Sequence, residues 1–196
     1  MTTLLLVRHG ETDWNRDGRW QGHADTPLNE RGREQARSLA AQLEGGESIA
    51  AVYASDLARA RETAEIVAAP LGLEVEIDPR LREIDFGSWE GLTTPEIEQR
   101  FPEEVARWRS NDGSQAFAGG ETYAEMGERV VRALSDIAAA HPSQTVLVIL
   151  HGGPIRGILA HAAGVTYGEQ RRLRAQLANC DVVRIAVEDG VFAPVD

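Results

Sequence analysis

The chain has 196 residues, of which 42% are hydrophobic and 26% are charged, and its formal net charge at pH 7 is −11. This length and composition suit a single globular domain over residues 1–196 and exclude a disordered or fibrous chain. The acidic balance argues against nucleic acid and against an anionic membrane as partners, because both are bound through broad basic surfaces.

Short apolar runs alternate with amphipathic helical patterns along the chain. In chain order, the patterns predict a strand at 3–8, a helix at about 29–44, a strand at 50–55, a helix at about 56–69, a strand at 73–77, a long helix from near Thr122, a strand at 145–150 and a helix after it. Strands that alternate with helices favour a parallel sheet. We therefore expect an α/β fold, a three-layer sandwich with a mostly parallel central sheet flanked by helices, with the strand order left open.

Two short signals mark the ends of predicted elements. Thr122 and Glu125 form a T-x-x-E capping box at the start of the long helix. Near the C-terminus, Asp189 and Gly190 form a turn signal between two apolar stretches. The tail is therefore expected to form a hairpin.

The single cysteine and the N-terminal segment bear on the compartment. Cys180 has no partner for an internal disulfide or for a Cys-based metal site, which favours a reducing compartment, and we interpret it as a small buried hydrophobic residue. The N-terminal segment lacks the basic and long apolar regions of a signal peptide, and the longest apolar run is too short to span a bilayer. We expect a cytoplasmic protein with no membrane partner.

Polar side chains collect where the predicted strands end. Arg8 and His9 follow the first strand, and His151 follows the apolar strand at 145–150. Arg59 falls in the first turn of the helix after the second strand, and Glu83 lies on a further extended segment. Because ligands of such folds bind outside the carboxyl ends of the strands, these side chains predict a ligand site.

The residue types at these strand ends fit phosphoryl transfer. All 20 basic residues are arginines, so the chain lacks the lysine of a Walker loop and any Schiff-base lysine. Arginine binds phosphate or carboxylate with a planar fork, a neutral histidine can attack phosphorus, and a carboxylic acid can protonate a leaving oxygen. Spacing alone does not separate Arg59 from Arg61, or Glu83 from Asp85.

Six segments between residues 4 and 156 carry these side chains and their surroundings. They read LVRHGETDWN (6–15), QGHADTPLNERGREQA (21–36), SDLARARETA (55–64), LREIDFGSWEG (81–91), GGET (119–122) and HGGPIR (151–156). In this order they resemble the successive motifs of the histidine phosphatase superfamily, in the branch shared with cofactor-dependent phosphoglycerate mutases. One such motif is weak evidence, whereas six in sequence are specific.

The resemblance implies a metal-independent phosphatase that hydrolyses a small-molecule phosphate monoester and needs no cofactor. It implies that His9 takes the phosphoryl group as phosphohistidine and that Glu83 is the proton donor. The remaining residues implied for the phosphate pocket are Arg8, Arg59 and His151, completed by Asn15, Gln21 and the backbone N–H of Gly152. No H-E-x-x-H or Cys/His spacing indicates a metal site.

The chain also departs from the family pattern. Leu150 stands where a serine often precedes the second histidine, and AGGE replaces the frequent PGGE. The mutases add a segment with a lysine and paired arginines, and this chain has no matching insertion between 91 and 119. We therefore expect hydrolysis. The alternatives are a cofactor-dependent phosphoglycerate mutase and a catalytically silent module that binds a phosphorylated ligand.

An aromatic stretch at about 86–120 is expected to be a specificity-determining insertion. Its aromatic residues are Phe86, Trp89, Phe101, Trp108 and Phe117. We expect it to form the wall over the pocket and to select the leaving group. Sugar phosphates, phosphoglycerate derivatives, nucleotide-loop phosphates and aryl phosphates all remain candidates, so the expected partner is a small-molecule phosphate ester, with the oligomeric state left open.

Overall fold

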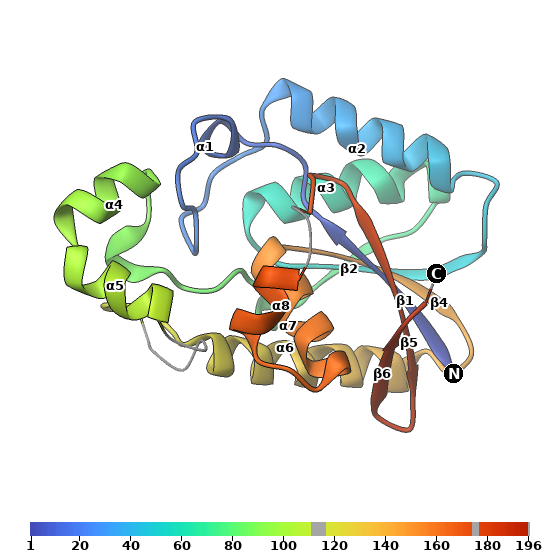
Figure 1. Ribbon diagram of the computed structural model, residues 1–196. Helices are drawn as coiled ribbons and strands as arrows, with labels where there is room; N and C mark the ends of the chain where they lie inside the picture. The colour runs from blue at the N-terminus through green and yellow to red at the C-terminus, as the bar shows by residue number, and fades with distance from the viewer. Residues whose placement is uncertain (111–116, 174–176, 196) are drawn as a thin grey trace.

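A six-stranded sheet forms the centre of the computed structural model, which describes residues 1–110, 117–173 and 177–195 (Figure 1). The strands are β1 (Thr2–Arg8), β2 (Ile49–Ala54), β3 (Val75–Ile77), β4 (Thr145–Leu150), β5 (Val182–Glu188) and β6 (Val191–Pro194). Their order across the sheet is β3-β2-β4-β1-β5-β6. Strands β3, β2, β4 and β1 are parallel, whereas β5 and β6 are antiparallel to their neighbours.

Strands β1 and β4 are central because both of their faces are apolar. The side chains from Leu4 to Val7 and from Val146 to Leu150 are all fully buried. A strand that is apolar on both faces is stable only where helices cover both sides of the sheet. The two uninterrupted apolar runs of the sequence therefore pair with each other in the middle.

Helices cover the sheet on both faces, as Figure 1 shows. The long helices are α2 (Glu30–Leu43), α3 (Ala58–Ala68), α6 (Tyr123–Ala140) and α7 (Gly152–Ala163). Leu5 and Val7 pack with α2 and α3, while Leu4 and Leu6 pack with α6 and α7. Because successive side chains of a strand point to opposite faces, β1 contributes to two separate cores. The expected three-layer α/β sandwich is confirmed.

Shorter elements lie beyond the sheet. They are the helices α1 (Asp13–Arg16), α4 (Thr94–Arg100), α5 (Pro102–Ser110) and α8 (Tyr167–Leu173), and the 3₁₀ turns Ala69–Leu71, Pro79–Leu81 and Gly87–Trp89. In Figure 1, α4 and α5 extend together to one side of the molecule. The sequence patterns did not predict these short elements, since a helix of two turns has too few apolar residues to show a period.

The end signals of the sequence have clear structural counterparts. Thr122 and Glu125 form the capping box of α6, with the Glu125 N–H 3.0 Å from the Thr122 hydroxyl oxygen. Asp189 and Gly190 have φ angles of 50° and 79°, as the two central residues of a tight hairpin turn require. Cys180 differs from expectation: it is only partly buried and has a left-handed φ of 62°.

The aromatic stretch at about 86–120 packs around Trp20. The Trp20 ring centroid lies 4.7 Å from that of Phe86, 5.5 Å from that of Trp89 and 5.4 Å from that of Trp108. Trp89 is 1% exposed and Phe117 is 5% exposed. The stretch thus extends the core that α6 and α7 form with the sheet, although residues 111–116 lie outside the described part. Among the described helices, none has the length and apolar character needed to cross a membrane.

We predict that the buried centre of the sheet dominates stability. Val148 is 0% exposed on β4 and Val191 is 66% exposed on β6. Val148→Ala should lower the free energy of unfolding by about 2 kcal/mol, through lost burial and the cavity left behind. Val191→Ala is the matched control and should change it by less than about 0.5 kcal/mol. Urea denaturation followed by circular dichroism measures both, and equal losses would contradict the prediction.

Candidate active site

The pairing of β1 with β4 brings two histidines together. Arg8 is opposite Leu150 in the register, so the residues that follow, His9 and His151, leave adjacent strand ends. The His9 backbone N–H donates to the Leu150 carbonyl at 3.0 Å. The two imidazole centroids are 5.1 Å apart, and His9 and His151 are 3% and 0% exposed. The carboxyl edge of the sheet therefore holds a buried imidazole pair.

The His9 ring has one nitrogen directed away from the backbone. Its Nδ1–H donates to the Gly10 carbonyl at 2.7 Å, and since a carbonyl can only accept, the proton of the neutral ring is on Nδ1. Nε2 therefore carries a lone pair. Burial, followed by the charges of Arg59 and Arg8, holds the pKa of His9 well below its usual value. The ring is neutral at physiological pH.

Close backbone packing fixes the chain after His9. A Cβ on Gly10 would lie 2.5 Å from the carbonyl oxygen of Gly32 in the first turn of α2. The Gly10 N–H donates to the Thr63 hydroxyl at 3.0 Å, and that hydroxyl donates to the Arg59 carbonyl at 2.7 Å. Because only glycine permits this approach, α2 and α3 hold the His9 backbone from two sides.

Arg59 is a fully buried cation in the first turn of α3. Its Nη1 and Nη2 donate to the carbonyls of Ala24 and Gly22 at 2.8 and 2.7 Å, while Nε has no hydrogen-bond partner. Burial lowers the pKa of Arg59 to about 10, so the guanidinium stays charged at neutral pH. The competing Arg61 is exposed and lies 3.8 Å from Glu65 in an ion pair.

Both ring nitrogens of His151 are also buried without a partner. Burial, followed by Arg59 and His9, holds the pKa of His151 well below its usual value. Buried polar atoms normally form hydrogen bonds. An anionic ligand that binds here could form hydrogen bonds with Nε of Arg59 and with the His151 ring.

The turn 177–181 holds the end of β1 from the other side. The Arg8 Nη1 donates to the Leu177 carbonyl at 2.5 Å, and the Cys180 N–H donates to the Arg8 carbonyl at 2.8 Å. The Asn179 amide donates to the His9 carbonyl at 2.8 Å and to the Asn15 Oδ1 at 3.3 Å. Sequence reasoning missed Asn179, because only the register of β5 against β1 brings it to the site.

The Glu83 carboxylate lies at the start of α7. Its oxygens accept the Gly153 N–H at 3.1 and 3.2 Å and the Ile84 N–H at 3.0 Å. A Cβ on Gly153 would lie 2.1 Å from Glu83 Oε1, so the carboxylate needs a glycine there. The competing Asp85 instead accepts the Gly87 N–H at 2.8 Å within its own loop.

Two further side chains, unassigned from the sequence, hold the Glu83 backbone. The His23 Nε2–H donates to the Glu83 carbonyl at 2.9 Å, and the Arg129 Nη2 donates to the same oxygen at 2.7 Å. Arg129 is also paired with Glu121 at 2.7 Å. The segment 21–36 and the long helix α6 thus support the same residue, Glu83, which no local spacing in the sequence indicates.

The side-chain oxygens of Asn15 and Gln21 are already occupied. Asn15 Oδ1 accepts the Thr12 N–H at 3.2 Å in the capping box of α1. Gln21 Oε1 accepts the hydroxyls of Thr12 and Thr26 at 3.0 and 2.5 Å. Among the described residues, neither the Asn15 Nδ2 nor the Gln21 Nε2 has a protein acceptor, so both NH₂ groups can donate to a ligand.

Gly152 supplies the first backbone N–H of α7. The first N–H groups of a helix have no acceptor within it, and the helix dipole favours an anion at this end. Among the described residues, no cluster of three His, Cys, Asp or Glu side chains is arranged to hold a metal ion. Positive charge at the site comes from guanidinium groups.

The structure is an α/β sandwich whose central strands end in buried, neutral histidines beside the buried guanidinium of Arg59, an arrangement suited to an anionic ligand. The family model of the histidine phosphatase superfamily (branch 1) matches residues 4–195, and the chain belongs to this superfamily.

Relatives and solved structures agree with this membership. Phosphoserine phosphatase 1 of Hydrogenobacter thermophilus is 39% identical over 165 residues, which cover 84% of this chain and 78% of that protein. Bacillus stearothermophilus YhfR superposes with a TM-score of 0.91 at 36% identity, covering 99% of this chain and 95% of that one. A mycobacterial glucosyl-3-phosphoglycerate phosphatase in complex with VO3 gives 0.87 at 30% identity, covering 98% and 96%.

The neutral, buried histidines predict a pH effect on stability. Unfolding returns His9 and His151 to water, where each binds a proton near its ordinary pKa of about 6.5. Below that pH the unfolded state binds more protons than the folded state, so stability is lost as the pH falls from about 6.5 toward the lowered folded pKa values. Each histidine adds up to about 1.4 kcal/mol per pH unit to this slope.

His151→Asn removes one of the two contributions. Urea denaturation between pH 7 and pH 5 should give a shallower fall in the free energy of unfolding for the variant than for the wild type. His161→Asn, at an exposed position of α7, controls for the loss of a histidine as such. An unchanged slope in His151→Asn would show that His151 is not neutral in the folded protein.

Proposed function

We propose that the protein is a metal-independent phosphatase that hydrolyses a small-molecule phosphate monoester through a phosphohistidine on His9. One observation carries the proposal: a neutral His9, with its lone pair on Nε2, lies next to buried donors of Arg59 and His151 that have no partner. The names of two relatives, a phosphoserine phosphatase and a glucosyl-3-phosphoglycerate phosphatase, support the same reaction class.

Binding of the phosphate group is the first step. Its oxygens accept hydrogen bonds from the guanidinium groups of Arg8 and Arg59, from His151, and from the N–H of Gly152 at the start of α7. The NH₂ groups of Asn15 and Gln21 add neutral donors. Because these donors are already oriented by the fold, they stabilise the charge that develops on the transferring oxygens.

The phosphoryl group then moves to His9. Nε2 forms a bond to phosphorus as the bond from phosphorus to the ester oxygen breaks, and the protonated carboxyl of Glu83 gives its proton to that oxygen. The Nδ1–H of His9 stays on the Gly10 carbonyl and disperses the positive charge of the ring. The alcohol leaves, and Glu83 is left as a carboxylate.

Water completes the turnover. The Glu83 carboxylate takes a proton from a water molecule, whose oxygen attacks phosphorus as the bond from phosphorus to Nε2 of His9 breaks. This releases inorganic phosphate and restores neutral His9 and protonated Glu83. The hydrogen bond from the Gly153 N–H holds the carboxylate in one place for both proton transfers.

The proposal is tested by phosphate release from a panel of phosphate esters in EDTA. The wild type should turn over members of the panel, and a folded His9→Ala variant should lose more than about 10³-fold, beyond the cost of losing one electrostatic donor. His161→Ala, on an exposed part of α7, is the control and should keep full activity. Turnover that survives in His9→Ala, or that EDTA abolishes and a divalent ion restores, would overturn the proposal.

We also predict that Gly153→Ala impairs proton transfer. The new methyl group would lie 2.1 Å from the position of Glu83 Oε1 and would push the carboxylate away from α7. We expect kcat to fall by about 10²-fold, the lower end of what general acid-base catalysis contributes. Gly127→Ala is the matched control, since a Cβ there meets nothing within 4 Å. Equal kcat values for both variants would show that the position of Glu83 does not limit the reaction.

A further inference from the structure

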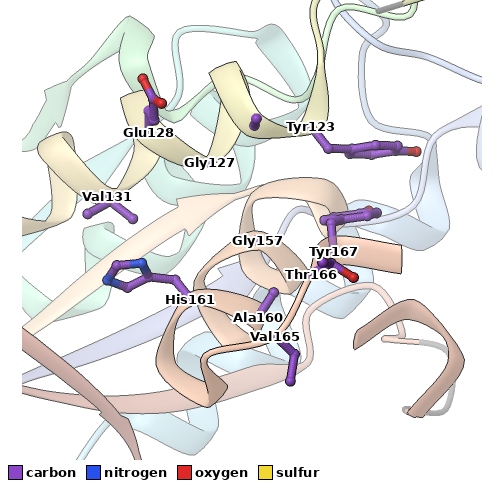
Figure 2. Close-up of a pocket in the computed structure, with 11 residues that line it drawn as sticks. Tyr123, Gly127, Glu128, Val131, Gly157, Ala160, His161, Val165, Thr166 and Tyr167 are labelled. Carbon is purple, nitrogen blue, oxygen red and sulfur yellow. The ribbon is translucent and has the colours of Figure 1, made fainter. Parts of the chain in front are cut away.

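Two features lie beside the site without a part in the proposed reaction. One is a cavity of about 420 Å³ between α6 and α7, where the rings of Tyr123 and Tyr167 stack at one end (Figure 2). The described residues that line it include none that the proposed reaction uses. The other is the turn 177–181, whose Asn179 donates to the His9 carbonyl. Of the two, the turn is therefore the one that can act on the nucleophile.

The turn has a specific shape that its own contacts maintain. The Ala178 N–H donates to Asp181 Oδ2 at 2.6 Å, and the Asp181 N–H donates to the Ala178 carbonyl at 3.3 Å. Cys180 has a φ of 62°, a left-handed conformation that is unfavourable for a residue with a Cβ. Its N–H donates to the Arg8 carbonyl at 2.8 Å. Such backbone strain persists only where the surrounding structure holds it, and it is frequent at functional sites.

Two acceptors fix the orientation of the Asn179 amide. Its Nδ2 donates to the His9 carbonyl at 2.8 Å and to Asn15 Oδ1 at 3.3 Å. Because a carbonyl oxygen can only accept, the nitrogen of the amide has to face His9. An NH₂ group has two hydrogens, and these two acceptors use both of them. Asn179 therefore links the backbone of the nucleophile to the side chain of Asn15.

The same contacts fix the orientation of the Asn15 amide. Asn15 Oδ1 accepts the Thr12 N–H at 3.2 Å as well as the Asn179 amide. Two donors on the oxygen leave Nδ2 at the other end of the amide, where it can donate to a ligand. If the Asn15 amide were turned by 180°, Nδ2 would meet both donors, and in the proposed reaction Oδ1 would face the phosphate group. Asn179 thus opposes the orientation in which Asn15 would repel phosphate.

We propose that Asn179 is a positioning residue, which keeps the Asn15 N–H directed at the phosphate group while it holds the backbone of His9. This inference rests on the proposed phosphatase function, and it adds a residue that lies outside the six motif segments. Asn15 touches the phosphate group, and Asn179 acts on the reaction through Asn15. Bond making and bond breaking stay with His9 and Glu83.

The test is a double-mutant cycle on Asn15 and Asn179, with kcat/KM measured on p-nitrophenyl phosphate. Asn179→Leu keeps the size of the side chain and removes both donors, and it should lower kcat/KM by about 5- to 10-fold, the range of one net hydrogen bond. Asn15→Ala should lower it by at least as much. Added to Asn15→Ala, the change Asn179→Leu should cost less than about twofold, because the amide that Asn179 orients is already gone.

Ala178→Gly is the matched control for the order of the turn. Ala178 is exposed, and glycine there gives the unfolded chain more freedom, so the melting temperature should fall while kcat/KM stays unchanged. Melting temperatures are measured for every variant. A loss of kcat/KM in Ala178→Gly as large as that in Asn179→Leu would show that the order of the turn matters and not the Asn179 amide, and would overturn the inference.

The outcomes separate this inference from the proposed function. Full activity in Asn179→Leu, or an equal loss with and without Asn15, would overturn the positioning role while phosphatase activity stood. Should the wild type hydrolyse no ester, the phosphatase function would fall, and calorimetric titration with inorganic phosphate would run the same cycle on binding. Coupling between the two positions would then still support the orientation of Asn15 by Asn179. Independent losses, or no phosphate binding by the wild type, would overturn it.

Discussion

The backbone N–H of His9 donates to the carbonyl of Leu150, and this bond continues the pairing of β1 with β4 past the last residues of both strands. The pair lies in the middle of the sheet, because both strands are apolar on both faces and need helices above and below. The same central position buries the imidazoles of His9 and His151. Their burial then keeps them neutral, which a nucleophilic nitrogen requires.

The site combines neutral imidazoles with permanent cations. A buried guanidinium is costly unless its N–H groups have acceptors, and Arg59 meets this condition with the carbonyls of Ala24 and Gly22 rather than with a carboxylate. Carbonyls satisfy the hydrogen bonds without cancelling the charge. The positive field of Arg59 therefore remains available to an anion, and it also opposes protonation of both histidines. In the proposed reaction, Arg59 thus both attracts the phosphate group and keeps the attacking nitrogen of His9 deprotonated.

The layers of the fold and the residues at the strand ends could be predicted from the sequence, because both depend on local signals. The apolar runs at β1 and β4, the Thr122 cap and the Asp189–Gly190 turn each act within a few residues. The contacts of Asn179 with His9 and of Gly153 with Glu83 could not be predicted, because they depend on where β5 and Glu83 lie relative to distant elements. Likewise, exposure and an ion pair with Glu65 distinguish Arg61 from Arg59, and neither is visible in helical spacing.

The aromatic stretch and α7 contribute different kinds of side chain to the region around Glu83. Trp89 and Phe117 are buried against each other, with centroids 5.0 Å apart, so their rings stabilise the stretch from within. Polar groups gather instead within five residues of α7: the Gly152 N–H at the start of the helix, the Gly153 N–H that donates to Glu83, and the guanidinium of Arg156 near that of Arg8. Because α7 is a helix that follows directly on β4, these groups are held in fixed positions rather than on a loop that can adapt.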